Sequence, residues 1–478
     1  MKNKLPLITW AAPAGEPASP DYTLEVADQP VFVYQARVRA DIWEHPGLWT
    51  HKPDCSGERV AFAIFDIREP VTVTVTAPQP ITSAIVLPAR ASITPEVRAG
   101  VVRFTLSKAQ HVTVLCNGSA QHALHLFVGE PEQDAPRPDN PQVVYFGPGV
   151  HEITELNIQS GQTVYLAGGA VVKAKLRHNE TGKLHEKFKI PTYDGAIFRA
   201  SNAANVRICG RGILDGSAIP HLGKNFIGIG NSRQVRLSGI TLRDASNWNV
   251  CLTGCTDVEV DDLRIISGRL NSDGINSVSC QRVNVRHCFV RNHDDSIVAK
   301  TMLPDAPCED ITVEDCVIWC DWGYALGVTY ETRSHISRVK FRRCDVLAAR
   351  HWVMGIRVAD SGTISDIRFE DIAVADLWMA GKRQNIPDDP ALIHIVIWVD
   401  GWGTDLERGH VRDVVINGVI VDGERLPSTH ISGSDAEHQI ENVSVRNVRL
   451  RGHAPVADAT GLGAQTNAFV RGLTVKTD

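Results

Sequence analysis

Long apolar runs are missing from this 478-residue sequence. No stretch approaches the ~18 consecutive apolar residues that a membrane span requires. The N-terminus also lacks the ~7–15-residue apolar centre of a signal peptide, because the apolar patch from Leu5 to Ile8 is too short. We therefore expect no membrane partner and a cytoplasmic location, with secretion after removal of a signal as the alternative.

A strong excess of charge of one sign is also absent. The formal net charge is −6, with 22% charged and 43% hydrophobic residues, which is the composition of a soluble globular protein. Such mild acidity gives no electrostatic reason to expect nucleic acid or an anionic membrane as a partner.

The eleven cysteines contain no C-x-x-C pair, and no set of Cys and His partners completes a zinc pattern. A disulfide framework would be unusual in a chain of this length. We interpret the cysteines as reduced and mostly buried, as small apolar core residues.

The segment from residue 130 to residue 142 divides the chain. Its sequence, EPEQDAPRPDNPQ, has the composition of a linker. Before it, short runs with period-2 alternation recur between turn residues, as in VTVTVTA and RVAFAIFDI. Closely spaced strands without a helical pattern predict a β-sandwich over residues 1–135, followed by a second domain over residues 136–478.

A β-strand triplet repeats through the second part of the chain. Most intervals between triplets are 23–29 residues, and each triplet is followed by one or two further short strands. Three short strands per turn of about 25 residues predict a right-handed parallel β-helix, so the whole chain is expected to be all-β. The triplets begin at residues 206, 235, 258, 283, 311, 339, 367, 414 and 443.

Two details follow from this repeat. Cys288, Cys316 and Cys344 are 28 residues apart and share one position in the repeat, so we expect them to stack as a ladder inside the solenoid. The 47-residue interval from 367 to 414 contains an insertion over residues 376–410. Long loops on solenoids often build a binding face.

Three carboxylates stand out between residues 271 and 300. Asp273 follows Asn271 and Ser272, and the pair Asp294-Asp295 follows 21 to 22 residues later, close to one coil. Because neighbouring strands lie about 4.8 Å apart, the three carboxyl groups should form one patch on the outside of the solenoid. Like charges at that distance raise at least one pKa, which provides an acid and a base from one residue type. The chain must kink for Asp294 and Asp295 to face the same side.

Two other interpretations of these residues remain open. Acidic residues at solenoid corners can be solvated turn residues, which is how we interpret Asp257 and Asp310. Paired carboxylates together with Asn271 could also ligate calcium. The match of the spacing to the coil period favours a catalytic set, for which no metal and no cofactor is needed.

Aromatic and charged residues near the carboxylates are typical of a sugar cleft. The segments DWGYALGVTYET and ARHWVMGIRVAD lie one to three coils further on, and we favour Tyr324 and Arg357 as sugar contacts. Trp319 and Trp378 are assigned to packing. The predicted substrate-binding set is Asn271, His293, Lys300, Tyr324, Glu331, Arg357, Trp248 and Trp352.

These motifs resemble the polygalacturonase family of glycoside hydrolases, family 28. That family carries Asn-Thr-Asp, then Gly- or Gln-Asp-Asp one coil later, and the matching segments here are Asn271-Ser272-Asp273 and His293-Asp294-Asp295. Its glycine-rich entry segment appears as ICGRGILDG at residues 208–216. The resemblance implies inverting hydrolysis in which Asp294 is the general acid and Asp273 and Asp295 activate the attacking water. Asn271 and His293 would tune the carboxylates by hydrogen bonding.

Two family elements are altered. The Gly-His-Gly position reads Gly323-Tyr324-Ala325, and the Arg-Ile-Lys position reads Arg357-Val358-Ala359. In the family that Arg and Lys help to hold a uronate carboxylate, so the missing Lys argues against a galacturonan substrate. The layout of a β-sandwich before this β-helix is similar to the dextranase and isopullulanase family, which acts on neutral α-glucans.

The expected partner is a poly- or oligosaccharide substrate, and a homo-oligomer is possible. Cytoplasmic location would favour short imported oligosaccharides, and an insertion that closes one end of the cleft would favour cleavage at chain ends. Rival functions are a polysaccharide lyase with Lys300 or Arg357 as base, an intramolecular glycosyltransferase, and a non-catalytic carbohydrate-binding β-helix.

Overall fold

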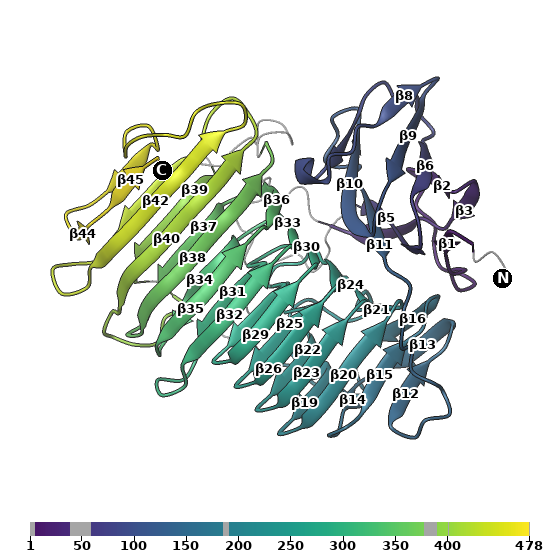
Figure 1. Cartoon of the computed structure of the whole chain (residues 1–478). Helices are drawn as coiled ribbons and strands as arrows, with labels where there is room; N and C mark the ends of the chain where they lie inside the picture. Colours follow the sequence, from purple (N-terminus) through teal and green to yellow (C-terminus); the bar gives the residue numbers. More distant parts are fainter. Residues whose placement is uncertain (1–4, 39–58, 185–190, 377–389, 400, 478) are drawn as a thin grey trace.

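The chain folds into an N-terminal β-sandwich followed by a right-handed parallel β-helix, as predicted (Figure 1). The computed structural model describes residues 5–38, 59–184, 191–376, 390–399 and 401–477. Within these ranges the secondary structure is almost entirely strand, apart from the 3-10 helix η2(Ala89–Ala91). No helix in the described ranges has the length and apolarity that crossing a membrane requires.

Two mostly antiparallel sheets form the sandwich. Strands such as β6 alternate buried and more exposed residues, so one face of each sheet packs on the shared core. The first sheet contains β1(Leu7–Ile8), β4(Tyr34–Arg37), β5(Arg59–Ile67), β7(Ala84–Leu87), β10(Gln110–Cys116) and β11(Leu124–Gly129). The second contains β2(Thr23–Val26), β3(Gln29–Val31), β6(Val71–Thr76), β8(Glu96–Arg98) and β9(Val101–Leu106).

The β-helix begins at β12, after the connection from Gly129 to Val143 in which the predicted boundary falls. Each full coil contributes one strand to an 11-stranded parallel sheet and two strands to a 21-stranded sheet. The 11-stranded sheet contains β14(Leu156–Asn157), β19(Ala196–Ser201), β22(Asn225–Gly230), β25(Val250–Thr253), β28(Ile275–Val278), β31(Ile297–Thr301), β34(Tyr324–Thr332), β37(Trp352–Val358), β39(Ala391–Ile397), β41(Ser428–Ser432) and β43(Ala464–Thr466).

The larger sheet covers the other two faces of the solenoid. In the last complete coils its two strands merge into one long strand, as in β38 and β40. Its members are β12(Val143–Phe146), β13(Gly149–Ile153), β15(Thr163–Leu166), β16(Ala170–Ala174), β20(Ala204–Gly210), β21(Ile213–Asp215), β23(Arg233–Ser238), β24(Thr241–Arg243), β26(Thr256–Asp261), β27(Arg264–Ile266), β29(Gln281–Arg286), β30(Phe289–Asn292), β32(Cys308–Glu314), β33(Val317–Cys320), β35(Ile336–Arg342), β36(Asp345–Ala349), β38(Thr363–Val374), β40(His410–Val421), β42(Ile440–Leu450), β44(Val470–Arg471) and β45(Thr474–Lys476). A separate hairpin joins β17(Lys183–Leu184) and β18(Pro191–Thr192).

Residues of like kind stack inside the solenoid from coil to coil. Cys288, Cys316 and Cys344 are fully buried, which confirms the predicted ladder. Phe341 and Phe369 stack with their ring centroids 4.9 Å apart. The ten cysteines within the described residues form no disulfide, and nine of them are buried.

The predicted insertion over 376–410 is only partly a loop. Residues 391–397 form β39, which pairs in parallel with both β37 and β41 and is therefore a regular coil strand. The prediction missed this strand because the apolar run IHIVIW lies between long polar stretches. Trp378, which was assigned to packing, lies outside the described residues.

The sandwich rests on one side of the β-helix, next to β24, β30, β33 and β36 (Figure 1). Phe62 and Phe127 of the sandwich belong to one apolar cluster with Phe289 and Trp319 of the β-helix, so the assignment of Trp319 to packing is confirmed.

Buried ion pairs surround this apolar cluster. Asp66 of the sandwich accepts a hydrogen bond from Arg211 Nε at 2.9 Å. Arg37 of the sandwich donates to Asp244 of the β-helix, with Nε at 2.7 Å from Oδ2, and the other oxygen of Asp244 accepts from Arg269 Nε at 2.9 Å. Separating a buried charge from its partner is strongly destabilising. These contacts therefore restrict the relative position of the two domains.

We expect the stacked core to be sensitive to truncation. Phe341→Ala should lower the free energy of unfolding by about 3–5 kcal/mol, because it removes a buried ring and leaves a cavity. Chemical denaturation followed by circular dichroism measures this change. The matched control is Leu406→Ala at a side chain that is 97% exposed, for which we expect a change within about 0.5 kcal/mol. Equal effects of the two substitutions would contradict this assignment.

Candidate active site

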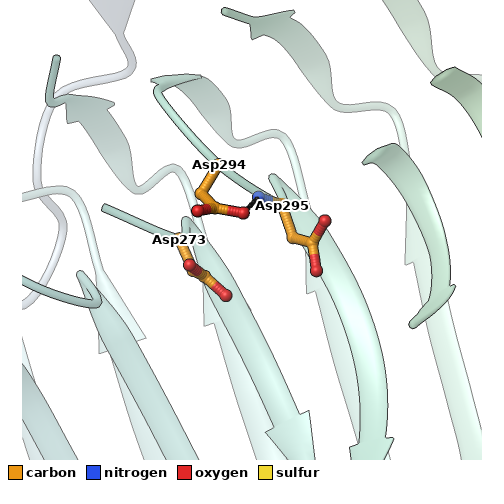
Figure 2. Close-up of side chains that lie close together, drawn as sticks. All are labelled: Asp273, Asp294 and Asp295. Carbon is orange, nitrogen blue, oxygen red and sulfur yellow. Dashed lines mark hydrogen bonds between the residues drawn. The ribbon is translucent and has the colours of Figure 1, made fainter. Parts of the chain in front are cut away.

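Three aspartates meet at the turns that lead into the 11-stranded sheet (Figure 2). Asp273 lies between β27 and β28, and Asp294 and Asp295 lie between β30 and β31 in the next coil. One oxygen of each carboxyl group lies within 4.8 Å of one oxygen of each of the others. Asp273 is only 3% exposed and Asp295 only 1%, whereas Asp294 is half-buried. The cluster is therefore more enclosed than the outward-facing patch expected from the sequence.

The turn at 293–296 provides the kink that the adjacent aspartates require. Asn292 ends β30, and its side-chain amide donates to the carbonyl oxygens of Ser272, Asp294 and Asp295 at 2.9–3.2 Å. Ser296 Oγ in turn donates to Asn292 Oδ1 at 2.6 Å. The amide of Asn292 thus connects two coils and orients both aspartates, a role that sequence reasoning missed.

Asp295 is held by three donors. The backbone N–H of Tyr324 donates to Oδ1 at 3.0 Å, and Thr329 Oγ1 and Lys300 Nζ donate to Oδ2 at 2.7 and 3.3 Å. Gly323 permits the first of these bonds, because it adopts a φ of +74° and a Cβ there would lie 2.7 Å from the Asp295 nitrogen. Hydrogen bonds of this kind complement a carboxylate, so Asp295 is suited to act in its ionised form.

Asp294 has the properties of an acid. Burial raises the pKa of Asp294 to about 7, the adjacent Asp295 carboxylate adds to this rise, and the Lys300 ammonium opposes it. Burial, followed by the charge of Asp294, also raises the pKa of Asp273 well above its usual value. The cluster can therefore retain a proton near neutral pH beside an ionised carboxylate.

Lys300 supplies positive charge to the cluster. Its ammonium lies 2.9 Å from Glu331, 3.3 Å from Asp295 and 3.9 Å from Asp273. Burial alone would lower the pKa of Lys300, but the carboxylates of Glu331, Asp295 and Asp273 raise it above its ordinary value. The aspartate spacing alone would allow a metal ion, yet this ammonium already balances the same oxygens, which weakens the calcium interpretation.

A pocket of about 330 Å³ opens above the carboxylates. Of the predicted substrate-binding residues, Asn271, Lys300, Glu331 and Trp248 line it together with the three aspartates. The pocket is rich in aromatic side chains, which can pack on sugar faces. Its aromatic members are Tyr193, Trp248, Trp322, Tyr330 and Trp402.

The other four predicted residues lie outside this pocket lining. His293 is fully buried beside Trp322, with 5.8 Å between ring centroids. The guanidinium carbon of Arg357 lies 4.7 Å from the Tyr330 ring centroid. Tyr324 is also fully buried, so the prediction that its ring contacts sugar is wrong.

The burial of Tyr324 has a clear packing cause. Gly355 has no side chain, so the Tyr324 ring lies directly on the sheet at that position. Trp352 stacks on the ring with 4.3 Å between centroids, and the Tyr324 hydroxyl is hydrogen-bonded to His394 Nδ1 at 2.6 Å. Trp352 therefore serves as a cover for Tyr324, and Tyr324 serves the site through its backbone N–H.

Several pocket residues escaped the sequence prediction. Tyr193 and Asp194 follow the β17–β18 hairpin, and Trp402 comes from the segment after β39. Trp402 therefore brings part of the predicted insertion to the pocket. These residues reach the pocket from loops, for which the coil period gives no register. Thr329 could have been found, because it lies on the strand that follows Lys300 in the same sheet.

Comparison with known proteins supports the resemblance. The family described as "Glycosyl hydrolases family 28" matches residues 151–381. That stretch of the β-helix is therefore similar to family 28. It includes all three aspartates, Lys300 and Glu331.

Two curated relatives are similar to parts of this chain. "Polygalacturonase" from Medicago sativa is 24% identical over 270 residues, which is 51% of this chain and 59% of the relative. "Probable polygalacturonase" from Vitis vinifera is 24% identical over 143 residues, which is 30% of this chain and 25% of the relative. The chain thus spans about a quarter to three fifths of the length of these relatives.

Two solved structures share the fold. Dex49A from Penicillium minioluteum has a TM-score of 0.65 and 14% identity, and the match covers 98% of both chains. The exopolygalacturonase from Thermotoga maritima has a TM-score of 0.54 and 16% identity over 70% of this chain and 83% of that one. The first match includes the N-terminal sandwich, so both domains have a counterpart of the same architecture.

The raised pKa of Asp294 predicts a pH-dependent effect on stability. Below the unfolded-state pKa of about 3.9, Asp294 is protonated in both the folded and the unfolded state. As the pH rises toward 7, Asp294 ionises first in the unfolded state. Its effect over this range is therefore to lower the free energy of unfolding. Asp294→Asn should remove this effect. We expect its stability advantage over wild type to grow by about 1–3 kcal/mol between pH 5 and pH 8, measured by chemical denaturation. An advantage that shrinks over this range would contradict the assignment.

Proposed function

We propose that this protein is a glycoside hydrolase that cleaves O-glycosidic bonds of a poly- or oligosaccharide. The observation that carries the proposal is the pairing of a carboxyl group whose pKa is raised to about 7, Asp294, with the firmly held carboxylate of Asp295 in an aromatic pocket. An acid and a base of one residue type with different environments are what glycoside hydrolysis needs. The family 28 match supports the same class of reaction.

In the proposed reaction Asp294 donates its proton to the glycosidic oxygen while the bond to the anomeric carbon breaks. Water attacks that carbon and gives its proton to Asp295, while Asp273 helps to hold the water. Lys300 keeps Asp295 in position and balances the negative charge of the cluster. The residues need no cofactor for these steps.

Inversion by single displacement is proposed on the resemblance to family 28. Carboxyl groups of inverting enzymes are ordinarily ~6.5–9.5 Å apart and those of retaining enzymes ~5–5.5 Å apart. The nearest oxygens here lie within 4.8 Å, which is below the ordinary inverting range. We assign the short separation to a third carboxylate: Asp273 and Asp295 together would hold one water beside Asp294.

The site gives less support to a lyase. A lyase needs a neutral base beside a uronate, but the neighbouring carboxylates raise the pKa of Lys300 and keep it protonated. Arg357, the other candidate base, is not part of the pocket lining. The product distinguishes the other two rival functions from hydrolysis. Hydrolysis releases a new reducing end, transfer within an oligosaccharide gives a rearranged sugar, and binding without cleavage gives no product.

Asp294→Asn should reduce the rate of reducing-sugar release by about 10²–10⁴-fold, because it removes the general acid. The assay uses galacturonans, rhamnogalacturonan fragments, dextran, pullulan and fructans as substrates. The matched control is Asp257→Asn, which we expect to keep full activity. Asp257 is an exposed residue of β26, not the turn residue expected from the sequence, and it pairs with Arg282 at 2.7 Å. Undiminished release by Asp294→Asn would exclude this residue as the acid.

The anomeric configuration of the first product tests the single-displacement step. We expect proton NMR, recorded within the first minutes of hydrolysis, to detect the anomer opposite to that of the cleaved bond. A product with the original configuration would instead assign Asp295 or Asp273 as a nucleophile that forms a covalent intermediate. Cleavage that gives an unsaturated sugar, detected by ultraviolet absorbance, would contradict hydrolysis.

A further inference from the structure

The pocket carries an excess of negative charge. Its described lining includes the carboxyl groups of Asp194, Asp273, Asp294, Asp295 and Glu331, and its one Lys or Arg side chain is Lys300. Asp273 and Asp294 can share protons near neutral pH, and Asp194 has an exposed partner in Lys183 at 2.8 Å. Even without these three, the two carboxylates of Asp295 and Glu331 face one ammonium.

Glu331 is the nearest of these partners to Lys300. Its carboxylate lies 2.9 Å from the ammonium, closer than Asp295 at 3.3 Å and Asp273 at 3.9 Å. The Glu331 side chain is 21% exposed and lines the pocket, whereas the Lys300 side chain is 3% exposed. Glu331 is therefore the more exposed partner at the pocket wall, and it already pairs with the positive charge that a substrate carboxylate would seek.

Arg357, a further cation near the pocket among the described residues, faces aromatic rings. The guanidinium carbon of Arg357 lies 4.7 Å from the Tyr330 ring centroid and 5.5 Å from that of Trp398, and Arg357 is absent from the pocket lining. On the pocket side, the Lys300 ammonium lies 5.3 Å from the Trp248 ring and 5.4 Å from the Tyr330 ring. The pocket therefore offers ring faces and hydrogen-bonding groups to a sugar, and it offers carboxylates to a charged one.

We propose that the site takes an uncharged glycan and that Glu331 is the residue that excludes uronates, because it occupies the ammonium of Lys300. A uronate would bring a further carboxylate into contact with Glu331 and Asp295, and like charges brought together at a binding site suppress wrong partners. Neutral sugars meet no such repulsion. This inference rests on the proposed hydrolysis and names its substrate class.

Matched pairs of glycans that differ only in charge test the inference. One pair is polygalacturonate and the same polymer after carboxyl reduction, and the other is pullulan and its C6-oxidised form; dextran serves as a further neutral substrate. We expect kcat/KM for the neutral member to exceed that for the charged member by about tenfold or more in any pair that is cleaved. If the enzyme cleaves the charged member of a pair faster, and Asp294→Asn abolishes that cleavage, the inference is overturned and the proposed hydrolysis stands. No cleavage of any of the five would count against both.

Glu331→Gln then tests the residue itself. The substitution keeps the shape of the side chain and removes its charge, so we expect the neutral-to-charged ratio of kcat/KM to fall by about three- to tenfold, even if the overall rate also falls. Glu309→Gln is the control, because Glu309 pairs with Arg338 at 3.1 Å on the larger sheet, and it should leave the ratio unchanged. A structural defect would lower both rates together. An unchanged ratio in Glu331→Gln would therefore overturn the role of Glu331.

Discussion

Parallel pairing of one coil on the next is the constraint on which the rest of this structure depends. Ile275 pairs with Ile297, and Ile297 pairs with Leu326, so each coil repeats the position of the coil before it. The turns that precede these strands are consequently stacked as well. Asp273 and the pair Asp294-Asp295 meet because their turns occupy the same place in successive coils. The proposed active site is thus a consequence of register, not of a dedicated scaffold.

That dependence explains why the central part of the site could be predicted from the sequence. The coil period is visible in the recurring triplets, and the spacing from Asp273 to Asp294 matches it, so proximity follows from arithmetic alone. Lys300 and Glu331 lie in the strands that directly follow, so the same register brings them next to the carboxylates. The β-sandwich was predicted from alternation and turn residues, which need no knowledge of the partner sheet.

The outer parts of the site depend on information that the period does not contain. Tyr324 was expected in the cleft, but the bare backbone of Gly355 in the next coil lets its ring lie flat beneath Trp352. A glycine one coil away thus decides whether an aromatic ring contacts substrate or supports the sheet. Tyr193 and Trp402 belong to loops, whose paths depend on packing against distant residues. The local sequence cannot specify such contacts.

The ion pairs between the two domains bear on how this protein could have evolved. Arg37 of the sandwich contacts Asp244, and Asp244 also holds Arg269, which lies four residues before Asp273 in the same turn. Position 37 is therefore connected through two side chains to the segment that carries Asp273, one of the proposed catalytic carboxylates. Among homologues we expect positions 37, 244 and 269 to vary together, so that the sandwich is inherited with its β-helix. Exchange of the sandwich between homologues would require compensating changes next to the turn that carries Asp273.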